Sequence, residues 1–196
     1  MVGKLEWLGD DGPLVLLADA EADGWLGLWR EATKQDPANE VETWAGKRMI
    51  MDVDVDEDDP TTDYARACTA LEEPAVAATV WFEGGVALAF ETSGHQATIV
   101  KAGDDVVVAK WIFASTEAHA AEVLSTLPSD LVWDETDVIF ELKKNGVRLH
   151  PAASRTEADV PTLPFALSAG RYAVATTLFE PDEDSSFELF RLRRVR

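Results

Sequence analysis

Residues 75–90, AVAATVWFEGGVALAF, decide the fold class, because two apolar runs flank the turn residues Glu83-Gly84-Gly85. Residues 97–113, ATIVKAGDDVVVAKWIF, repeat this arrangement around Gly103-Asp104-Asp105. Short runs rich in β-branched and aromatic residues, separated by glycine-containing turns, are typical of strands. We therefore predict four strands here, joined as an antiparallel meander.

The rest of the chain continues the β pattern. Near the start, the turn signal Asp10-Asp11-Gly12-Pro13 separates a short apolar segment from the run Leu14–Leu17, which predicts two short strands. Asn145-Gly146 is a dipeptide typical of tight hairpin turns, and we expect it to join two paired strands. The strands expected in the last third cover residues 137–144, 147–150, 162–167, 171–180 and 187–195.

Three segments favour helices. Residues 63–71, DYARACTAL, follow Thr61 and Thr62, either of which can cap a helix with its hydroxyl. Residues 115–127 begin at Ser115, another good cap, and end before Pro128. A third helix is expected within residues 25–35, ending before Asp36-Pro37.

These patterns predict an α+β fold that is β-rich, with mostly antiparallel sheets and a few short helices. The length of 196 residues suits a single domain over residues 1–196. An alternative within that domain is a pair of lobes, about 1–127 and 128–196, that share a continuous core.

The charge balance narrows the classes of partner. The chain has 37 acidic and 17 basic residues, a net charge of −20. Such a field repels nucleic acids and anionic membrane surfaces and attracts basic partners. The arginine-rich end, RLRRVR, is therefore expected to pair with acids of the same chain or to protect a sheet edge.

Targeting signals are not evident in the sequence. No apolar run reaches the roughly 18 residues of a membrane-spanning helix, and the N-terminal residues lack a signal-peptide pattern. A single cysteine, Cys68, is consistent with a reducing compartment. We expect a cytoplasmic protein in which Cys68 is a small buried residue rather than a nucleophile.

The run DVDVDEDDP, residues 52–60, is the most acidic part of the chain. Residues 49–55 alternate apolar and acidic side chains, which is the pattern of a half-buried strand. Three interpretations stand: a solvated loop, a bound cation, or a surface for a basic partner. The spacing begins like a calcium-binding loop, but Glu57 replaces the required glycine and Pro60 interrupts it, so no metal is predicted. The candidate partner-binding residues of the run are Asp52, Asp54, Asp56, Glu57, Asp58 and Asp59.

Tight binding usually depends on a few buried aromatic anchors, and the chain has seven tryptophans. Trp81 and Trp111 lie within apolar strands and are expected in the core. Trp25, Trp29 and Trp44 lie in polar or glycine-containing surroundings close to the acidic run. They complete the predicted partner-binding set.

No catalytic motif is recognised. His95, His119 and His150 are far apart in sequence, and Ser93 near His95 lacks the pattern of a catalytic nucleophile. We predict a binding protein that is not an enzyme and needs no cofactor. An unrecognised hydrolase is the least favoured alternative.

Several fragments in order resemble the immunity protein 21 family. They are EWLGDDGPLVLLADAEADGWLG (6–27), DYARAC (63–68), VVVAKWIFAS (106–115) and LSAGRYAVATTLFEPDE (167–183). The chain departs from the family pattern at Asp11, where the family has glycine, and the resemblance does not extend to residues 33–60.

The resemblance implies a cytoplasmic antitoxin that neutralises its cognate polymorphic toxin by direct binding. The net charge favours a basic toxin, such as a nuclease. The alternative is an acidic protein that mimics nucleic acid and occupies a basic surface on another protein. The oligomeric state is not predicted.

Overall fold

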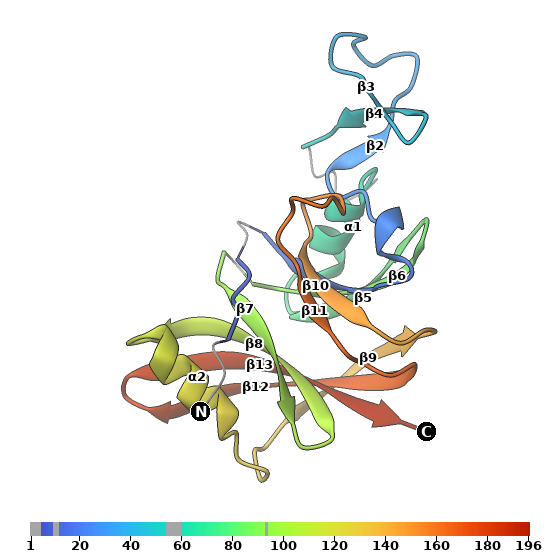
Figure 1. Cartoon of the computed structure of the whole chain (residues 1–196). Coiled ribbons are helices and arrows are strands. Elements are labelled where there is room, and N and C mark those ends of the chain that lie inside the picture. Colours follow the sequence, from blue (N-terminus) through green and yellow to red (C-terminus); the bar gives the residue numbers. More distant parts are fainter. Residues whose placement is uncertain (1–4, 10–11, 54–59, 93) are drawn as a thin grey trace.

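The computed structural model describes residues 5–9, 12–53, 60–92 and 94–196, and within them most strands form two five-stranded antiparallel sheets (Figure 1). Sheet 1 has the order β11 (Leu163–Phe165), β10 (Val147–Pro151), β1 (Leu14–Ala18), β6 (Gly85–Phe90), β5 (Ala77–Phe82). Sheet 2 has the order β7 (Ala97–Ala102), β8 (Asp105–Ala114), β13 (Ser185–Val195), β12 (Gly170–Asp182), β9 (Asp134–Leu142). The prediction of a β-rich α+β fold is confirmed.

The two sheets pack face to face, and a helix covers each outer face (Figure 1). Helix α1 (Asp63–Ala70) packs on sheet 1 through Ala67, followed by Leu71. Helix α2 (Glu117–Ser125) packs on sheet 2 through Ala120 and Leu124. The short 3-10 helix η1 (Ala22–Gly24) adds Ala22 to the α1 side. The chain therefore has a layered core of helix, sheet, sheet and helix.

Strand β1 shows why a continuous apolar run forms a strand here. Leu14 and Leu16 point into the core between the sheets, whereas Val15 and Leu17 point toward α1. Alternate side chains of a strand face opposite sides of the sheet, so both sides must be apolar when both are covered. Strand β8 does the same in sheet 2, where residues 106–109 alternate between the inner core and the α2 side.

The predicted meander is wrong in its connections. Strands β5 and β6 pair as expected, and so do β7 and β8, but β6 also pairs with β1 and lies in a different sheet from β7. The segment between Phe90 and Ala97 therefore crosses between sheets. Burial of both hairpins against other strands, which local sequence does not encode, decides this outcome.

Asn145-Gly146 is likewise a crossing point rather than a hairpin turn. Strand β9 pairs with β12 in sheet 2, and β10 pairs with β1 and β11 in sheet 1. Gly146 has a positive φ of 89°, as the turn signal predicts, and the Asn145 side-chain oxygen accepts a hydrogen bond from the Ala169 amide at 2.7 Å. The turn chemistry is present, but the strands that it joins find other partners.

The remaining sequence predictions have mixed outcomes. Thr62 caps α1 by accepting from the Ala65 amide at 3.0 Å, as expected, whereas α2 is capped by Thr116 rather than Ser115. The segment before Asp10 forms only an isolated bridge from Leu8 to Ala97. The helix expected within residues 25–35 is wrong, because this segment contains strand β2 (Trp29–Glu31).

The chain does not divide near residue 127 into separate sheets. Sheet 1 combines β1, β5 and β6 with β10 and β11, and sheet 2 combines β7 and β8 with strands from the last third. Strands from both sides of residue 127 are thus hydrogen-bonded to each other. Among the described residues, no helix combines the length and apolar character needed to cross a membrane.

The double burial of β1 yields a stability prediction. Leu16→Ala and Leu17→Ala remove side chains from opposite faces of the strand, and each should lower the free energy of unfolding by about 2–5 kcal/mol. Leu178→Ala is the control, because Leu178 is 60% exposed and its loss should cost little. Urea unfolding measures all three. A Leu17→Ala loss as small as that of the control would contradict the packing of α1 on sheet 1.

Candidate partner-binding surface

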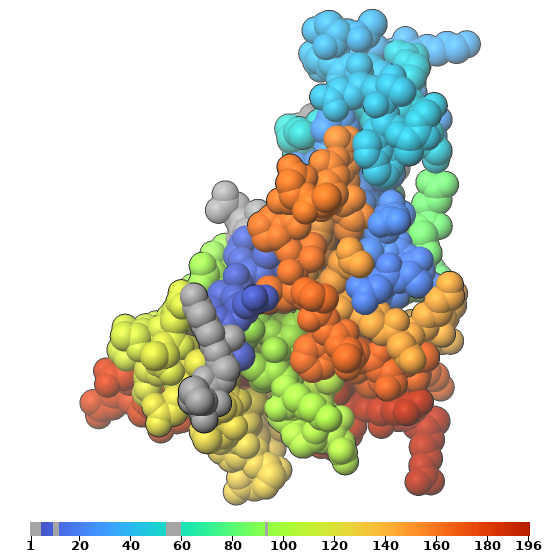
Figure 2. Space-filling model, in the orientation of Figure 1, coloured from blue at the N-terminus to red at the C-terminus, as the bar shows by residue number. Residues whose placement is uncertain are grey.

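A third sheet stands away from the two large ones (Figures 1 and 2). Strands β2, β4 (Lys47–Met51) and β3 (Glu42–Trp44) form it in that order, all antiparallel. None of the described residues 26–63 belongs to the three apolar clusters of the main body. We refer to residues 29–52 as the arm.

Turn chemistry and one ion-pair network shape the arm. Ala45 and Gly46 both have positive φ, which gives the tight turn between β3 and β4 the twist that a two-residue hairpin needs. Arg30 donates to Asp36 through both Nη atoms at 3.0 Å and to Asp52 through Nε at 2.6 Å. Its guanidinium therefore ties the long β2–β3 connection to the residue that follows β4.

Asp36 is also bonded to the backbone of that connection. Its carboxylate accepts from the Thr33 amide at 2.6 Å and from the Thr33 hydroxyl at 2.9 Å. The Arg30 hydrogen bond, followed by the Thr33 amide, holds the pKa of Asp36 well below its usual range. Asp36 thus stabilises the arm in its ionised form.

Two of the predicted anchor tryptophans meet on one cation. The Arg155 guanidinium lies 4.3 Å from the ring centroid of Trp29 and 5.5 Å from that of Trp44. Both rings are half-buried, and Arg155 is also paired with Glu157. Cation–π contact of this kind contributes roughly 0.5–1 kcal/mol where solvent still reaches it. The cluster connects the arm to the loop after β10 and leaves part of each tryptophan accessible.

The base of the arm is fastened by backbone contacts. The Leu28 amide donates to the Ala153 carbonyl at 3.0 Å, and the Leu26 amide donates to Asp63 Oδ2 at 2.8 Å. Burial raises the pKa of Asp63, while the Leu26 amide and the Arg66 guanidinium oppose that rise. Gly27 has φ +59°, and a Cβ there would overlap with the Ala153 carbonyl. The arm is therefore a fixed element and not a free loop.

The acidic run adjoins the arm. Of its candidate residues, Asp54, Asp56, Glu57, Asp58 and Asp59 lie outside the described residues. Asp52 is described, and its carboxylate already pairs with Arg30 and accepts from the Thr61 hydroxyl at 3.3 Å. Asp52 is therefore part of the internal network of the arm rather than an open charge.

The predicted half-buried strand over residues 49–55 is wrong in its burial and its length. Strand β4 ends at Met51, and the two buried side chains are the neighbours Met49 and Ile50. Met51 and Val53, which the alternation placed on the buried side, are exposed. Only this short stretch of β4 is buried, because neither of the two large sheets packs against the arm.

The structure also corrects two tryptophans. Trp25 is fully buried, packs edge-on against Phe82 and donates from its indole nitrogen to the Ala152 carbonyl at 3.0 Å. It offers no surface to a partner, so its prediction as an interface anchor is wrong. Trp81 is 71% exposed at the end of the edge strand β5, so its prediction as a core residue is also wrong. Trp111 is partly buried against the α2 side of sheet 2.

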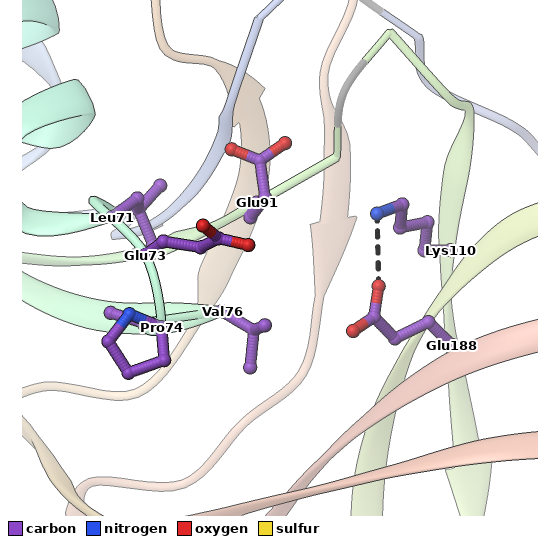
Figure 3. Close-up of a pocket in the computed structure, with 8 residues that line it drawn as sticks. Leu71, Glu73, Pro74, Val76, Glu91, Lys110 and Glu188 are labelled. Atoms are coloured by element: carbon purple, nitrogen blue, oxygen red, sulfur yellow. Dashed lines mark hydrogen bonds and ion pairs between the residues drawn. The ribbon is translucent and has the colours of Figure 1, made fainter.

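A cleft lies between the α1–β5 connection and sheet 2. It has a volume of about 720 Å³ and is lined by residues from the α1–β5 connection, the β6–β7 connection, β8 and β13. Figure 3 shows Glu73 and Glu91 on one side and the Lys110–Glu188 ion pair on the other, at 2.9 Å. The lining carries three carboxylates and one ammonium, a net charge of −2. We call it the acidic cleft, lined by Leu71, Glu73, Val76, Glu91, Lys110 and Glu188.

Sequence reasoning missed the acidic cleft because its members are up to 117 positions apart, from Leu71 to Glu188. One signal was available in Lys110, a lone charge within the apolar run of residues 106–113. Lys110 is buried, and a buried ammonium requires a partner. The sequence could have predicted an ion pair at this position, but not that Glu188 supplies it.

The three histidines weighed for catalysis lie in separate environments, and Ser93 lies outside the described residues. His150 is buried in β10 and bonds the Ser154 carbonyl, whereas His119 lies on α2 with Nε2 3.2 Å from Asp182. His95 lies in the connection between β6 and β7. Burial raises the pKa of the Cys68 thiol, which favours the unreactive thiol form. Within the part of the chain that is described, no group of three metal-ligating side chains gathers.

The sequence predicted that the C-terminal arginines either pair with acids of the same chain or protect a sheet edge. The first prediction is confirmed. Arg191 donates to Glu135 at 2.7 Å, and Arg193 donates to Asp105 at 3.2 Å. Strand β13 is central in sheet 2, so the alternative of a protected sheet edge is wrong.

Comparison of the chain with family models, curated proteins and solved structures finds no match. Membership of the immunity protein 21 family therefore stays a prediction.

The attachment of the arm can be tested with two glycines of nearly equal φ, Gly27 at +59° and Gly103 at +63°. Alanine should cost about 1–2 kcal/mol at either position, because both have left-handed backbone conformations. Only at Gly27 does the new Cβ meet the Ala153 backbone, whereas nothing lies within 4 Å at Gly103. Gly27→Ala should therefore lose about 1–3 kcal/mol more in urea unfolding. Equal losses would show that the arm can shift away from Ala153 freely.

The low pKa of Asp36 predicts acid sensitivity of the arm. Its ionised form contributes full stability above the ordinary carboxyl pKa of about 4, and that contribution is lost as the pH falls toward the folded pKa. Hydrogen-exchange protection of the Thr33 amide should fall in this range before that of Leu16 in β1. Asp36→Asn should lower Thr33 protection already at neutral pH and remove the dependence on pH. Unchanged Thr33 protection in this variant would rule out the proposed role of the carboxylate.

Proposed function

We propose that this protein is an immunity protein that binds and neutralises a basic toxin. Three observations support the proposal: the arm, the negative charge of the chain, and the resemblance of residues 6–27, 63–68, 106–115 and 167–183 to the immunity protein 21 family. The arm is the observation that carries it.

The arm is ordered without serving the main core. Fixing its backbone costs roughly 1–2 kcal/mol per residue, and in a core element burial of apolar area offsets that cost. In the arm only Met49 and Ile50 are deeply buried. The ion pairs of Arg30 and the cation–π contacts of Arg155 provide the other interactions that offset this cost. An element held in place by such specific contacts, at the edge of a rigid scaffold, is typical of recognition surfaces.

The chemistry of the arm suits a protein partner. Trp29 and Trp44 remain half-buried beside Arg155, and aromatic and arginine side chains dominate binding energy in interfaces. Trp81 is exposed on β5, and Glu83 at the end of the same hairpin pairs with Lys47 of the arm at 3.4 Å. The partly exposed tryptophans thus lie on elements that contact each other.

The sign of the partner's charge follows from the whole molecule and from the acidic cleft. A net charge of −20 attracts basic proteins and accelerates their association at low salt. The acidic cleft adds a local charge of −2 in a concave site, where a basic side chain would fit. Leu26 at the base of the arm bonds to Asp63 at the N-terminal end of α1, and Leu71 after its C-terminal end lines the cleft. One partner can therefore contact both the base of the arm and the cleft along a helix of eight residues.

The decisive experiment is co-expression with the protein encoded directly upstream. Binding at one-to-one stoichiometry in calorimetry, together with rescue of cells that express that protein, is the expected result. Absence of both would overturn the immunity proposal. If the protein instead binds a nucleic-acid-binding protein, in competition with the DNA or RNA of that protein, the result would support the alternative function as an acidic mimic of nucleic acid.

Charge neutralisation predicts a kinetic effect on that complex. Glu73→Gln with Glu91→Gln removes two charges from the acidic cleft and should slow association and flatten its salt dependence. Asp137→Asn with Glu141→Gln is the control, because it removes two exposed charges from β9, outside the cleft. Stopped-flow rates at several salt concentrations separate the two. Equal effects would assign steering to the total charge and not to the cleft.

Trp44 provides the matching test of affinity. Trp44→Ala should raise the dissociation rate at least tenfold if the ring is an anchor, about 1.4 kcal/mol or more. Val132→Ala, a loss of another exposed apolar side chain, should change nothing. Urea unfolding of both variants checks that the main body is intact. An unchanged dissociation rate for Trp44→Ala would remove the arm from the interface.

A further inference from the structure

A second cavity lies on the outer face of sheet 2, away from the acidic cleft. It has a volume of about 250 Å³ and is bounded by the β7–β8 turn, the end of α2 with the connection that follows it, and β13. In Figure 1 the connection after α2 and the β7–β8 turn meet at the same end of sheet 2. We call it the sheet 2 cavity.

The charge of this cavity is opposite to that of the molecule. Lys101, Arg191 and Arg193 contribute three positive charges, whereas Asp105 in the lining and Glu135, which pairs with Arg191, contribute two negative charges, a net charge of +1. The whole chain has −20, and the acidic cleft has −2. Three cations gathered in one hollow of such an acidic protein favour an anion there.

Arg191 is the buried member of the group. It is 5% exposed, its guanidinium lies 4.6 Å from the Trp133 ring centroid, and Nη2 donates to Glu135 Oε1 at 2.7 Å. Its Nε has no hydrogen-bond partner among the described residues, because the nearest Asp105 oxygen is 3.9 Å away. A buried donor without an acceptor is costly and calls for an explanation. The Arg191 charge is therefore paired with Glu135 and held in place by Trp133, but one of its buried N–H donors has no acceptor among the described residues.

Arg193 and Lys101 are the members that can contact a ligand. Arg193 uses Nε and Nη2 on Asp105, both at 3.2 Å, and more than half of its side chain is exposed. Lys101 is exposed on β7. Asp105 occupies the Nε–Nη2 edge of this guanidinium, so a ligand would approach its Nη1 edge and the Lys101 ammonium. A carboxylate suits that arrangement, because it accepts hydrogen bonds in the plane of a guanidinium.

Part of the wall of the cavity is apolar. Val107, Leu124, Leu127, Leu131 and Trp133 line it. A fully hydrated inorganic anion would gain nothing from this wall, whereas a carboxylate with an apolar body would bury that body against it. The volume equals about eight water molecules at 30 Å³ each, which limits the ligand to roughly the size of an aromatic monocarboxylate.

We propose that the sheet 2 cavity binds a small carboxylate with an apolar body, oriented by Arg193 and Lys101 beside the buried Arg191 and packed on Trp133. The carboxylate belongs either to a free acid or to the C-terminal residue of a peptide. This site is independent of the proposed toxin binding.

The test uses phenylacetate, its neutral analogue phenylacetamide, and N-acetyl-glycyl-phenylalanine, titrated into the isotopically labelled full chain. Saturable shifts of the Trp133 indole resonance are expected, with phenylacetate at least tenfold tighter than phenylacetamide and weaker at high salt. If the peptide binds more tightly than phenylacetate, the natural ligand is the C-terminus of a peptide chain. If phenylacetate binds more tightly, the natural ligand is a free acid. Both results support a carboxylate site in this cavity.

The variants Arg193→Gln and Lys101→Gln, combined, should weaken phenylacetate at least tenfold. Arg171→Gln with Lys143→Gln is the control, since both residues are exposed outside the cavity and the change of charge is the same. Equal affinity for phenylacetate and phenylacetamide, an equal loss in the control variant, or the absence of saturable shifts would each overturn the proposal.

Discussion

The burial of two strands on both of their faces is the constraint on which this structure depends. Strand β1 presents Leu16 to the core between the sheets and Leu17 to α1, and β8 presents residues 106–109 in the same way to the inner core and to α2. A strand buried on both sides needs a partner layer on each side. The two five-stranded sheets and their two covering helices follow from that requirement, and strands distant in sequence must join to provide them.

This rigid centre displaces the charged residues to the periphery and to the ends of the sheets. The two charged side chains that are nevertheless deeply buried in sheet 2, Lys110 and Arg191, each have a carboxylate partner. Both lie beside a cavity, and the two cavities have opposite charge. An acidic protein thus contains one concave site suited to a basic side chain and another suited to a small anion. The sign of each site depends on which residues the strand register brings together and not on the total charge.

The arm follows different physics from the core. It has no share in the large apolar clusters, and it is held by Arg30 between two aspartates and by Arg155 beside two tryptophans. Such contacts are individually weak, so the hydrogen bonds at its base, from Leu28 to Ala153 and from Leu26 to Asp63, add to the attachment of the arm to the body. The part of the chain that the sequence marked as a partner surface is therefore the part that depends most on polar and cation–π contacts.

The sequence by itself determined the strands that are buried, the helix at residues 63–71 with its Thr62 cap, and the acidic character, because these depend on local periodicity, capping and composition. It did not determine that β6 pairs with β1, or that β9 and β10 part at Asn145-Gly146, because pairing depends on which distant surfaces can cover an apolar face. Trp25 was predicted at the surface and is buried, whereas Trp81 was predicted in the core and is exposed. The reason is the same, because the burial of a ring depends on the layer that packs over it and not on its neighbours in sequence. The acidic cleft and the sheet 2 cavity also required the tertiary structure, since each joins side chains from three or more separate segments. Local chemistry specified the elements, and long-range packing decided their partners and the sites between them.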